Sequence, residues 1–371
     1  MTTTFTMRHL LFALCIVFIC ACTNDTNNTK VDAFDRTAML KGVADRAAIP
    51  SFKELQKNAD SVALLATQLV EIQIPTTQQI QTLRNAIANL IIVFQSVIGY
   101  DFGPAEGSLG SLVENVSTFP VNTASLEDLI AVADTSFLNF QRDTRGLSAL
   151  DYLFFRGTLT DVISNFSGEA GMNRRVYTKA VANAIARETR VVLNAWTGTY
   201  RQQFIDRSGT DAGSSVSLLF NNLNISYELL KNYKIALPLG KRAGQSASEP
   251  TRVEAYYQST SLELARLHFH AAVNLWYGKT PQGDTFPSFR SYLKTVANGD
   301  RLINDTEAQI TRIEEAFTTL GTSASLSTVI MSNPTAVEPL HSEMQKLTRF
   351  FKSEMSSLLG ISITYSSGDG D

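Results

Sequence analysis

Apolar residues recur at three- and four-residue steps along most of the chain from about residue 35 onward, which is the period of an amphipathic helix. The segment PTTQQIQTLRNAIANLIIVFQSV shows this well. Pro75 precedes the pattern Thr76-x-x-Gln79, which is typical of a capping box, and the apolar residues then follow at helical spacing. Further helical patterns cover residues 51–72, 173–205, 213–233, 250–277, 302–320 and 337–359.

Other local signals agree with a helical protein. The pattern Ser125-x-x-Asp128 is a helix start signal, and Gly360 follows the final helical pattern as an expected left-handed terminator. Alternation with period two occurs only in the short C-terminal segment GISITYSSGDGD. We therefore predict an all-α fold whose long helices bury their apolar faces in bundles.

The predicted helices exceed what a single four-helix bundle can hold, so we expect two bundle halves of the up-and-down type packed together. The polar, glycine-containing segment SNFSGEAGMNRR, residues 164–175, separates two helical patterns. On this basis the first bundle should cover residues 35–165 and the second residues 166–371.

The first 21 residues have the features of a lipoprotein signal peptide. The apolar run from Leu10 to Ile19 is too short to span a bilayer, and it ends in Ile19-Cys20-Ala21-Cys22, which has the form of a lipobox. Cys22 would then carry the lipid, and residues 22–34 would form a flexible polar tether. We expect anchoring to a bacterial membrane with the globular part in the periplasm. The alternatives to a lipoprotein signal peptide are an ordinary signal peptide and an apolar N-terminus of a cytosolic protein.

Cysteine usage and charge exclude several classes of protein. All three cysteines lie within the first 22 residues, so the processed chain would have no disulfide, thiolate metal site or cysteine nucleophile. The net charge is −3 and no run of basic residues occurs, which argues against a nucleic-acid partner.

Common catalytic motifs are also missing. The sequence contains no His-Glu-x-x-His, G-x-S-x-G, P-loop or G-x-G-x-x-G pattern. His268 and His270 are two residues apart, so on one helix they would point to different faces and could not share a metal ion. His341 is isolated in the sequence.

Three stretches taken together resemble the imelysin-like family, which comprises bacterial envelope proteins named for a peptidase and includes iron-regulated proteins. They are RNAIANLIIVFQSVIGYDFGP (residues 84–104), TRGLSALDYLFF (144–155) and TRVEAYYQSTSLELARLHFHAAVNLWYG (251–278). The ending LLGISITYSSGDGD is similar to the endings of Bacteroidetes-type members. The resemblance implies an all-helical protein with two bundle-like halves and a site between them.

The family site is implied to centre on a Gly-x-His-x-x-Glu segment, and this chain departs from it. Ser148 stands at the position of the histidine and Asp151 at that of the glutamate. A neutral hydroxyl is a poor ligand for iron or zinc compared with an imidazole. The two residues are three apart on one helix, so they either form a local polar pair or serve only packing and capping.

Two further groups complete the candidate site. One is the corner Tyr100-Asp101-Phe102-Gly103-Pro104, where Gly103 and Pro104 should end a helix and leave Tyr100 and Asp101 at its mouth. The other lies in the segment 251–278. Glu254, Ser261 and His268 recur every seven residues beside an apolar stripe, which suggests one helix face. Carboxylate and phenolate oxygens are the hard donors that ferric iron prefers. The candidate ligands for a metal or small molecule are therefore Tyr100, Asp101, Ser148, Asp151, Glu254, Tyr256, Tyr257 and Ser261.

These features predict a lipid-anchored envelope protein that binds a metal ion, with iron as the candidate, or a small ligand in a cleft between two helical bundles. Such a protein would act in iron acquisition with an outer-membrane or periplasmic transport partner. One alternative is a metal-dependent peptidase, which needs three protein ligands and a general base in one cleft. A non-catalytic protein-interaction module is the other.

Overall fold

The computed structural model describes residues 34–107, 109–137, 141–280, 282–321 and 325–365. The compact unit from Arg36 to the C-terminus is all-α in these residues, as predicted, apart from one antiparallel hairpin of β1 (Glu106–Gly107) and β2 (Gly110–Ser111). Its α-helices are α1 (Arg36–Gly42), α2 (Ile49–Val70), α3 (Thr77–Phe94), α4 (Leu112–Ser117), α5 (Thr123–Ala131), α6 (Gly146–Phe155), α7 (Leu159–Phe166), α8 (Met172–Thr197), α9 (Tyr200–Asp206), α10 (Ser215–Glu228), α11 (Leu237–Leu239), α12 (Ser261–Tyr277), α13 (Phe289–Leu293), α14 (Gly299–Leu320), α15 (Leu326–Ser332), α16 (Glu338–Arg349) and α17 (Met355–Leu359).

Short helical segments of other types join or extend these helices. The π-helical segments are η1 (Val43–Ala48), η5 (Leu229–Ala236) and η7 (Phe350–Glu354). The 3-10 segments are η2 (Ile98–Tyr100), η3 (Gly103–Ala105), η4 (Arg142–Thr144) and η6 (Pro334–Ala336). None of the helices in the described residues is both long and apolar enough to cross a membrane.

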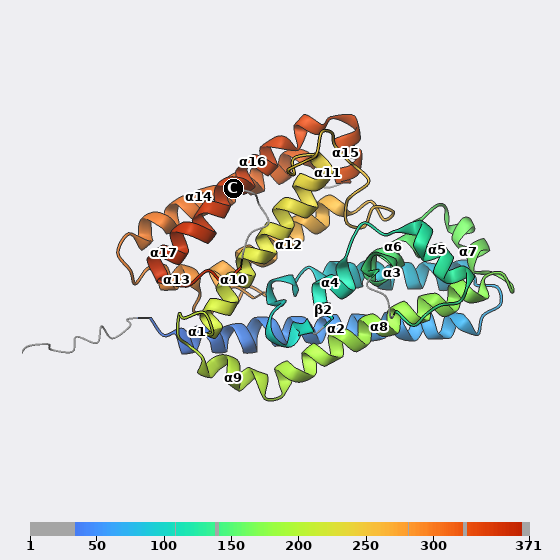
Figure 1. The fold of residues 1–371 in the computed structure, drawn as a ribbon, viewed down its shortest axis with the longest axis horizontal. Coiled ribbons are helices and arrows are strands. Elements are labelled where there is room, and N and C mark those ends of the chain that lie inside the picture. The colour runs from blue at the N-terminus through green and yellow to red at the C-terminus, as the bar shows by residue number, and fades with distance from the viewer. Residues whose placement is uncertain (1–33, 108, 138–140, 281, 322–324, 366–371) are drawn as a thin grey trace, which may run out of the picture. The chain divides into compact units, whose positions relative to one another are not determined.

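The helices pack in two groups (Figure 1). In one group α2 lies between α3 and α8, and α6 contacts both α3 and α8. In the other, α12 contacts α10 and η5, and α14 packs along α16. The short segment η2, which follows α3, contacts both α10 and α12 and so connects the groups. Helix α8 begins at Met172, within the range predicted for the second bundle, but it packs against α2 and α6 of the first group. The division of the chain into bundles at residues 165 and 166 stays a prediction.

Local signals in the sequence explain several helix ends. Thr76 forms the predicted capping box: its hydroxyl accepts the Gln79 N–H and its own N–H donates to the Gln79 side chain at 2.8 Å. Gly360 ends α17 in the left-handed conformation, as predicted. The start signal at Ser125 was wrong, because Asn122 caps α5 and its side chain accepts the Ser125 N–H.

The predicted helix over residues 250–277 is shorter than expected, because α12 begins only at Ser261. Ala255 and Ser259 have positive φ values of 47° and 63°, a conformation that interrupts a right-handed helix. Glu254 therefore lies in the turn before α12, so Glu254, Ser261 and His268 do not form one helix face. This turn carries the candidate site described below.

The alternating C-terminal segment forms no strand over residues 361–365. Its backbone is instead bound by the side chain of Asn221 on α10, which donates to Ser362 O at 2.9 Å and accepts the Thr364 N–H at 2.9 Å. A side-chain amide thus satisfies the groups that a neighbouring strand would otherwise pair.

Candidate functional site

Helix α6 carries the segment that resembles the family motif, and its first residue is held against α4. Gly146 has a φ of +74°, and a Cβ added to it would lie 2.3 Å from the carbonyl oxygen of Val116. Only glycine accommodates both this conformation and this approach. The close packing fixes the start of α6, and Ser148 and Asp151 are buried within its first two turns.

Both polar residues of α6 have partners within the protein. The Ser148 hydroxyl donates to the carbonyl oxygen of Thr118 at 2.7 Å. The Asp151 carboxylate accepts the N–H groups of Tyr257 and Gln258 at 3.0 and 2.9 Å, one on each oxygen. Asp151 therefore holds the turn that precedes α12.

Burial changes the acidity of Asp151. The residue is 2% exposed, and this desolvation raises the pKa of its carboxyl to about 7, with a smaller contribution in the same direction from Glu254. The two backbone N–H groups favour the ionised form and partly offset the effect.

Glu254 forms a buried ion pair that the sequence did not indicate. Lys234 Nζ on η5 lies 2.7 Å from Glu254 Oε2 and also donates to Gln95 Oε1 at 2.6 Å. The Gln95 amide in turn donates to Glu254 Oε1 at 3.1 Å, and the Ser117 hydroxyl donates to the same oxygen at 3.4 Å. Burial lowers the pKa of Lys234, while Glu254 opposes that shift.

Asp151 and Glu254 line one small cavity, so the structure brings these two predicted residues together. The cavity is about 10 Å³, room for about one water molecule. Other residues lining it include Ile91, Ser117, Leu147 and Ser148.

A metal ion does not fit this donor set well. One carboxylate already accepts two backbone N–H groups, and the other is paired with the Lys234 ammonium, which a metal would have to displace. Within the part of the chain that the structure describes, no group of three His, Cys, Asp or Glu side chains is placed to hold a metal ion.

The other predicted residues serve different contacts. Tyr100 is buried against Phe52, with ring centroids 6.5 Å apart, and this burial raises the pKa of its phenol. Tyr257 packs edge-on against both Tyr256 and Tyr152. The Ser261 hydroxyl accepts the Leu326 N–H at 3.1 Å and joins α12 to α15. None of these side chains lines the small cavity.

The two histidines of α12 point in different directions, as predicted. His268 is buried and its Nε2 lies 2.7 Å from the Ser226 hydroxyl of α10. His270 Nε2 lies 2.7 Å from a carboxylate oxygen of Glu314 on α14. Burial lowers the pKa of His268 well below its usual value, with a further contribution from Lys234.

Asp101 lies at a larger opening, which we call the Asp101 groove. It has a volume of about 380 Å³, within the range of small-molecule sites. Residues from α4 and the preceding segment lie in its lining together with residues of α10 and η5. They include Asp101, Glu114, Ile225, Glu228, Tyr233 and Arg242.

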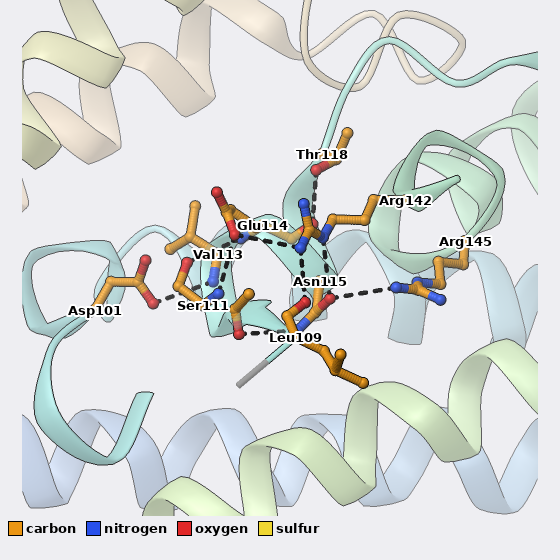
Figure 2. Close-up of polar contacts among 10 residues, drawn as sticks. Asp101, Leu109, Ser111, Val113, Glu114, Asn115, Thr118, Arg142 and Arg145 are labelled. Atoms are coloured by element: carbon orange, nitrogen blue, oxygen red, sulfur yellow. Dashed lines mark hydrogen bonds and ion pairs between the residues drawn. The ribbon is translucent and has the colours of Figure 1, made fainter. Parts of the chain in front are cut away.

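The Asp101 side of the groove is built around the start of α4 (Figure 2). The Asp101 carboxylate accepts the Val113 N–H at 3.2 Å and a hydrogen bond from the Ser111 hydroxyl. Ser111 and Glu114 form a capping box at the same helix end. Burial raises the pKa of Asp101 to about 6, and the nearby Glu114 and Glu106 add to this shift.

Two arginines hold this corner in place (Figure 2). Arg142 donates to the Leu109 carbonyl oxygen at 2.6 Å and to the Asn115 side chain at 3.3 Å, and it pairs with Glu114 at 3.6 Å. Arg145 donates to the same Asn115 oxygen at 3.3 Å. The hairpin and α4 are thus tied to the segment that leads into α6.

Sequence reasoning missed Lys234, Gln95 and the α10 side of the groove. Lys234 lies in a segment, LLKNYKIA, in which a lysine would ordinarily be placed on a solvated face. No short-range pattern links residues 95, 234 and 254, so only the fold reveals their contact. Cys22 and the predicted leader and tether, apart from Phe34, lie outside the described residues.

The fold resembles solved structures of low sequence identity. A crystal structure from Parabacteroides distasonis, which carries the description iron-regulated protein A precursor, matches with a TM-score of 0.71 at 18% identity and covers 87% of this chain and 95% of that one. An imelysin-like protein from Psychrobacter arcticum matches with a TM-score of 0.69 at 18% identity, covering 89% and 97%. No curated protein matches the chain.

A family model provides the assignment that the fold alone does not. The model described as Imelysin matches residues 48–349, which is most of the chain and includes α6, the turn before α12 and all of the Asp101 groove lining except Tyr365. The chain therefore belongs to the imelysin family.

Proposed function

We propose that this protein is a non-catalytic binding member of the imelysin family that holds a small ligand in the Asp101 groove. It would be anchored to the cell envelope through Cys22 and act in iron acquisition, passing its ligand to an outer-membrane or periplasmic transport partner. The description of the Parabacteroides distasonis structure as an iron-regulated protein A precursor supports this setting.

One observation carries the proposal: the carboxylate of Asp151 in the family-motif segment and that of Glu254 beside it are both bound to the protein itself, while a ligand-sized groove lies elsewhere. Asp151 holds a backbone turn and Glu254 neutralises Lys234. The cavity between them has room for about one water, whereas the Asp101 groove is about 380 Å³.

The same geometry disfavours the peptidase alternative. A catalytic metal site needs three protein ligands and an open position for water or substrate. Here Ser148 replaces the family histidine and donates its hydroxyl hydrogen to Thr118, so it offers no strong metal donor.

The decisive experiment combines metal analysis with proteolysis and ligand binding on the processed chain, purified without chelator. We expect iron well below one equivalent, no casein cleavage that EDTA abolishes, and saturable binding of small amphipathic probes at the Asp101 groove in two-dimensional NMR. Chelator-sensitive cleavage, or one tightly held metal ion lost in Asp151→Ala, would overturn the proposal.

Anchoring is tested separately, because it does not depend on the ligand site. The wild-type protein should incorporate labelled fatty acid and sediment with membranes, whereas Cys22→Ala should do neither. Equal sedimentation of the two proteins would refute the anchor and leave the binding proposal intact.

A further inference from the structure

The Asp101 groove contains a carboxylate that has no basic partner among the described residues. Two other acids in the lining are paired: Glu114 with Arg142 at 3.6 Å and Glu228 with Lys352 at 3.3 Å. The charges that act on Asp101 are instead those of Glu106 and Glu114, which are acidic. An ionised Asp101 is therefore both desolvated and repelled by its neighbours.

Building on the proposed function, we propose that the groove binds a small organic cation, an amine with an apolar body, whose ammonium group pairs with Asp101. The ammonium group of such a ligand would supply the positive charge that no described side chain supplies to Asp101. A hydrogen bond between two ionised groups is also about twice as strong as one between neutral groups.

The groove residues from α10 and η5 suit the apolar body of such a ligand. Ile225 on α10 and Tyr233 on η5 are 44% and 45% exposed, and both line the groove, so they offer an accessible aliphatic and aromatic surface to a ligand. Ile98 and Leu229 extend the apolar lining. Aromatic and aliphatic walls with a few placed polar groups are typical of small-molecule sites.

The one arginine in the lining does not neutralise Asp101. The Arg242 guanidinium lies over the Tyr233 ring, 4.1 Å from its centroid, and Arg242 is not among the charges that shift the pKa of Asp101. The contact shows that this ring face already accommodates one cation. A cationic ligand would use the Asp101 end of the groove.

Asp101 also has a structural contact, which a test must separate from binding. Its carboxylate accepts the Val113 N–H near the start of α4, so it could serve only to hold that helix. Asp101→Asn keeps one oxygen for this N–H, removes the charge and replaces the other carboxylate oxygen by an NH2 group. Asp128→Asn makes the same change on the exposed surface of α5, outside the groove, and serves as the matched control.

The experiment compares three probes of similar size on the processed chain at pH 7.5: 2-phenylethylamine, 2-phenylethanol and 3-phenylpropanoate. By calorimetry the amine should bind at least about tenfold more tightly than the alcohol, a difference of about 1.4 kcal/mol, and the anion most weakly. Asp101→Asn should remove the preference for the amine, and Asp128→Asn should preserve it.

A pH series on the wild type gives a second readout that does not depend on a variant folding. Amine affinity should fall as the pH drops below about 6, because Asp101 then takes up a proton. The other titratable or charged groups facing the groove are Glu114, Glu228, Tyr233, Arg242 and Tyr365, with Glu106 nearby.

The outcomes separate the two proposals. If all three probes bind in the groove with similar affinity, or Asp101→Asn retains the preference, the cation proposal fails and the binding function stands. If no probe binds, both fail.

Discussion

Lys234 Nζ lies 2.7 Å from Glu254 Oε2, and the two side chains are 2% and 8% exposed. The pair joins η5 to the turn before α12, and Gln95 adds the region that follows α3. Glu254 thus pairs with a cation that belongs to the protein, at the position where the sequence had suggested a ligand for iron. The Lys234–Glu254 ion pair therefore connects elements of the fold and stabilises their packing.

Replacing one member of this pair should be costly. Lys234→Met leaves the Glu254 carboxylate buried without its cation, so we expect the free energy of unfolding to fall by about 3–5 kcal/mol. The double variant Lys234→Met/Glu254→Met should recover most of this loss, because apolar pairs often replace buried ion pairs without penalty. Urea denaturation of the wild type, Lys234→Met, Glu254→Met and the double variant measures the effect. Equal losses in the single and double variants would contradict a coupled pair.

Asp151 should make the stability depend on pH. The pKa of its carboxyl is raised to about 7 in the folded protein, so between pH 4 and pH 7 the folded state binds more protons than the unfolded state. Its contribution to stability is therefore present at low pH and is lost as the pH rises through 7. The stability advantage of the wild type over Asp151→Asn should shrink by about 2 kcal/mol between pH 5 and pH 8. Denaturation at the two pH values tests this, and an advantage that grows with pH would refute it.

Gly146 should not tolerate a side chain. Gly146→Ala introduces strain at a φ of +74°, about 1–2 kcal/mol, and places a methyl group 2.3 Å from the Val116 carbonyl oxygen. Gly168→Ala is the matched control, because its φ of +65° carries the same strain but nothing lies within 4 Å of the added atom. Thermal unfolding should show a clearly larger loss for the first variant. Equal losses would mean that α4 and α6 separate easily.

Restoring the family histidine should not restore a metal site. Ser148→His places an imidazole beside a cavity of about 10 Å³ and removes the hydrogen bond to Thr118. Overpacking of this kind costs about 1–3 kcal/mol. We expect a lower unfolding temperature and no stabilisation by added zinc, measured by thermal shift. A rise of several degrees with zinc would show that only the imidazole was missing.

Helix content and many helix ends could be predicted because they depend on short-range patterns. The Thr76 capping box and the Gly360 terminator are set by residues within one turn of the helix end. The helix predicted over residues 250–260 does not form, because contacts between distant segments decide the backbone conformation there. Ala255 and Ser259 have positive φ values, and the turn between them is bound at the Tyr257 and Gln258 N–H groups by the distant Asp151 carboxylate, which no local pattern reveals.

The candidate site was predicted in part. Asp151 and Glu254 do line one cavity, but the sequence could not show that each is already paired, because Lys234 and Gln95 come from other elements. Asp101 was recognised from its place beside a helix end. Its groove depends on α10 and η5, more than 100 residues away along the chain.

The sequence alone determined that the protein is built from amphipathic helices and where many of them begin and end, because helical period and capping act over a few residues. Only the tertiary structure decided which polar side chains neutralise one another and which remain open to a ligand. Charge pairing and cavity volume depend on contacts between segments far apart in the chain, and those contacts exist only once the helices have packed.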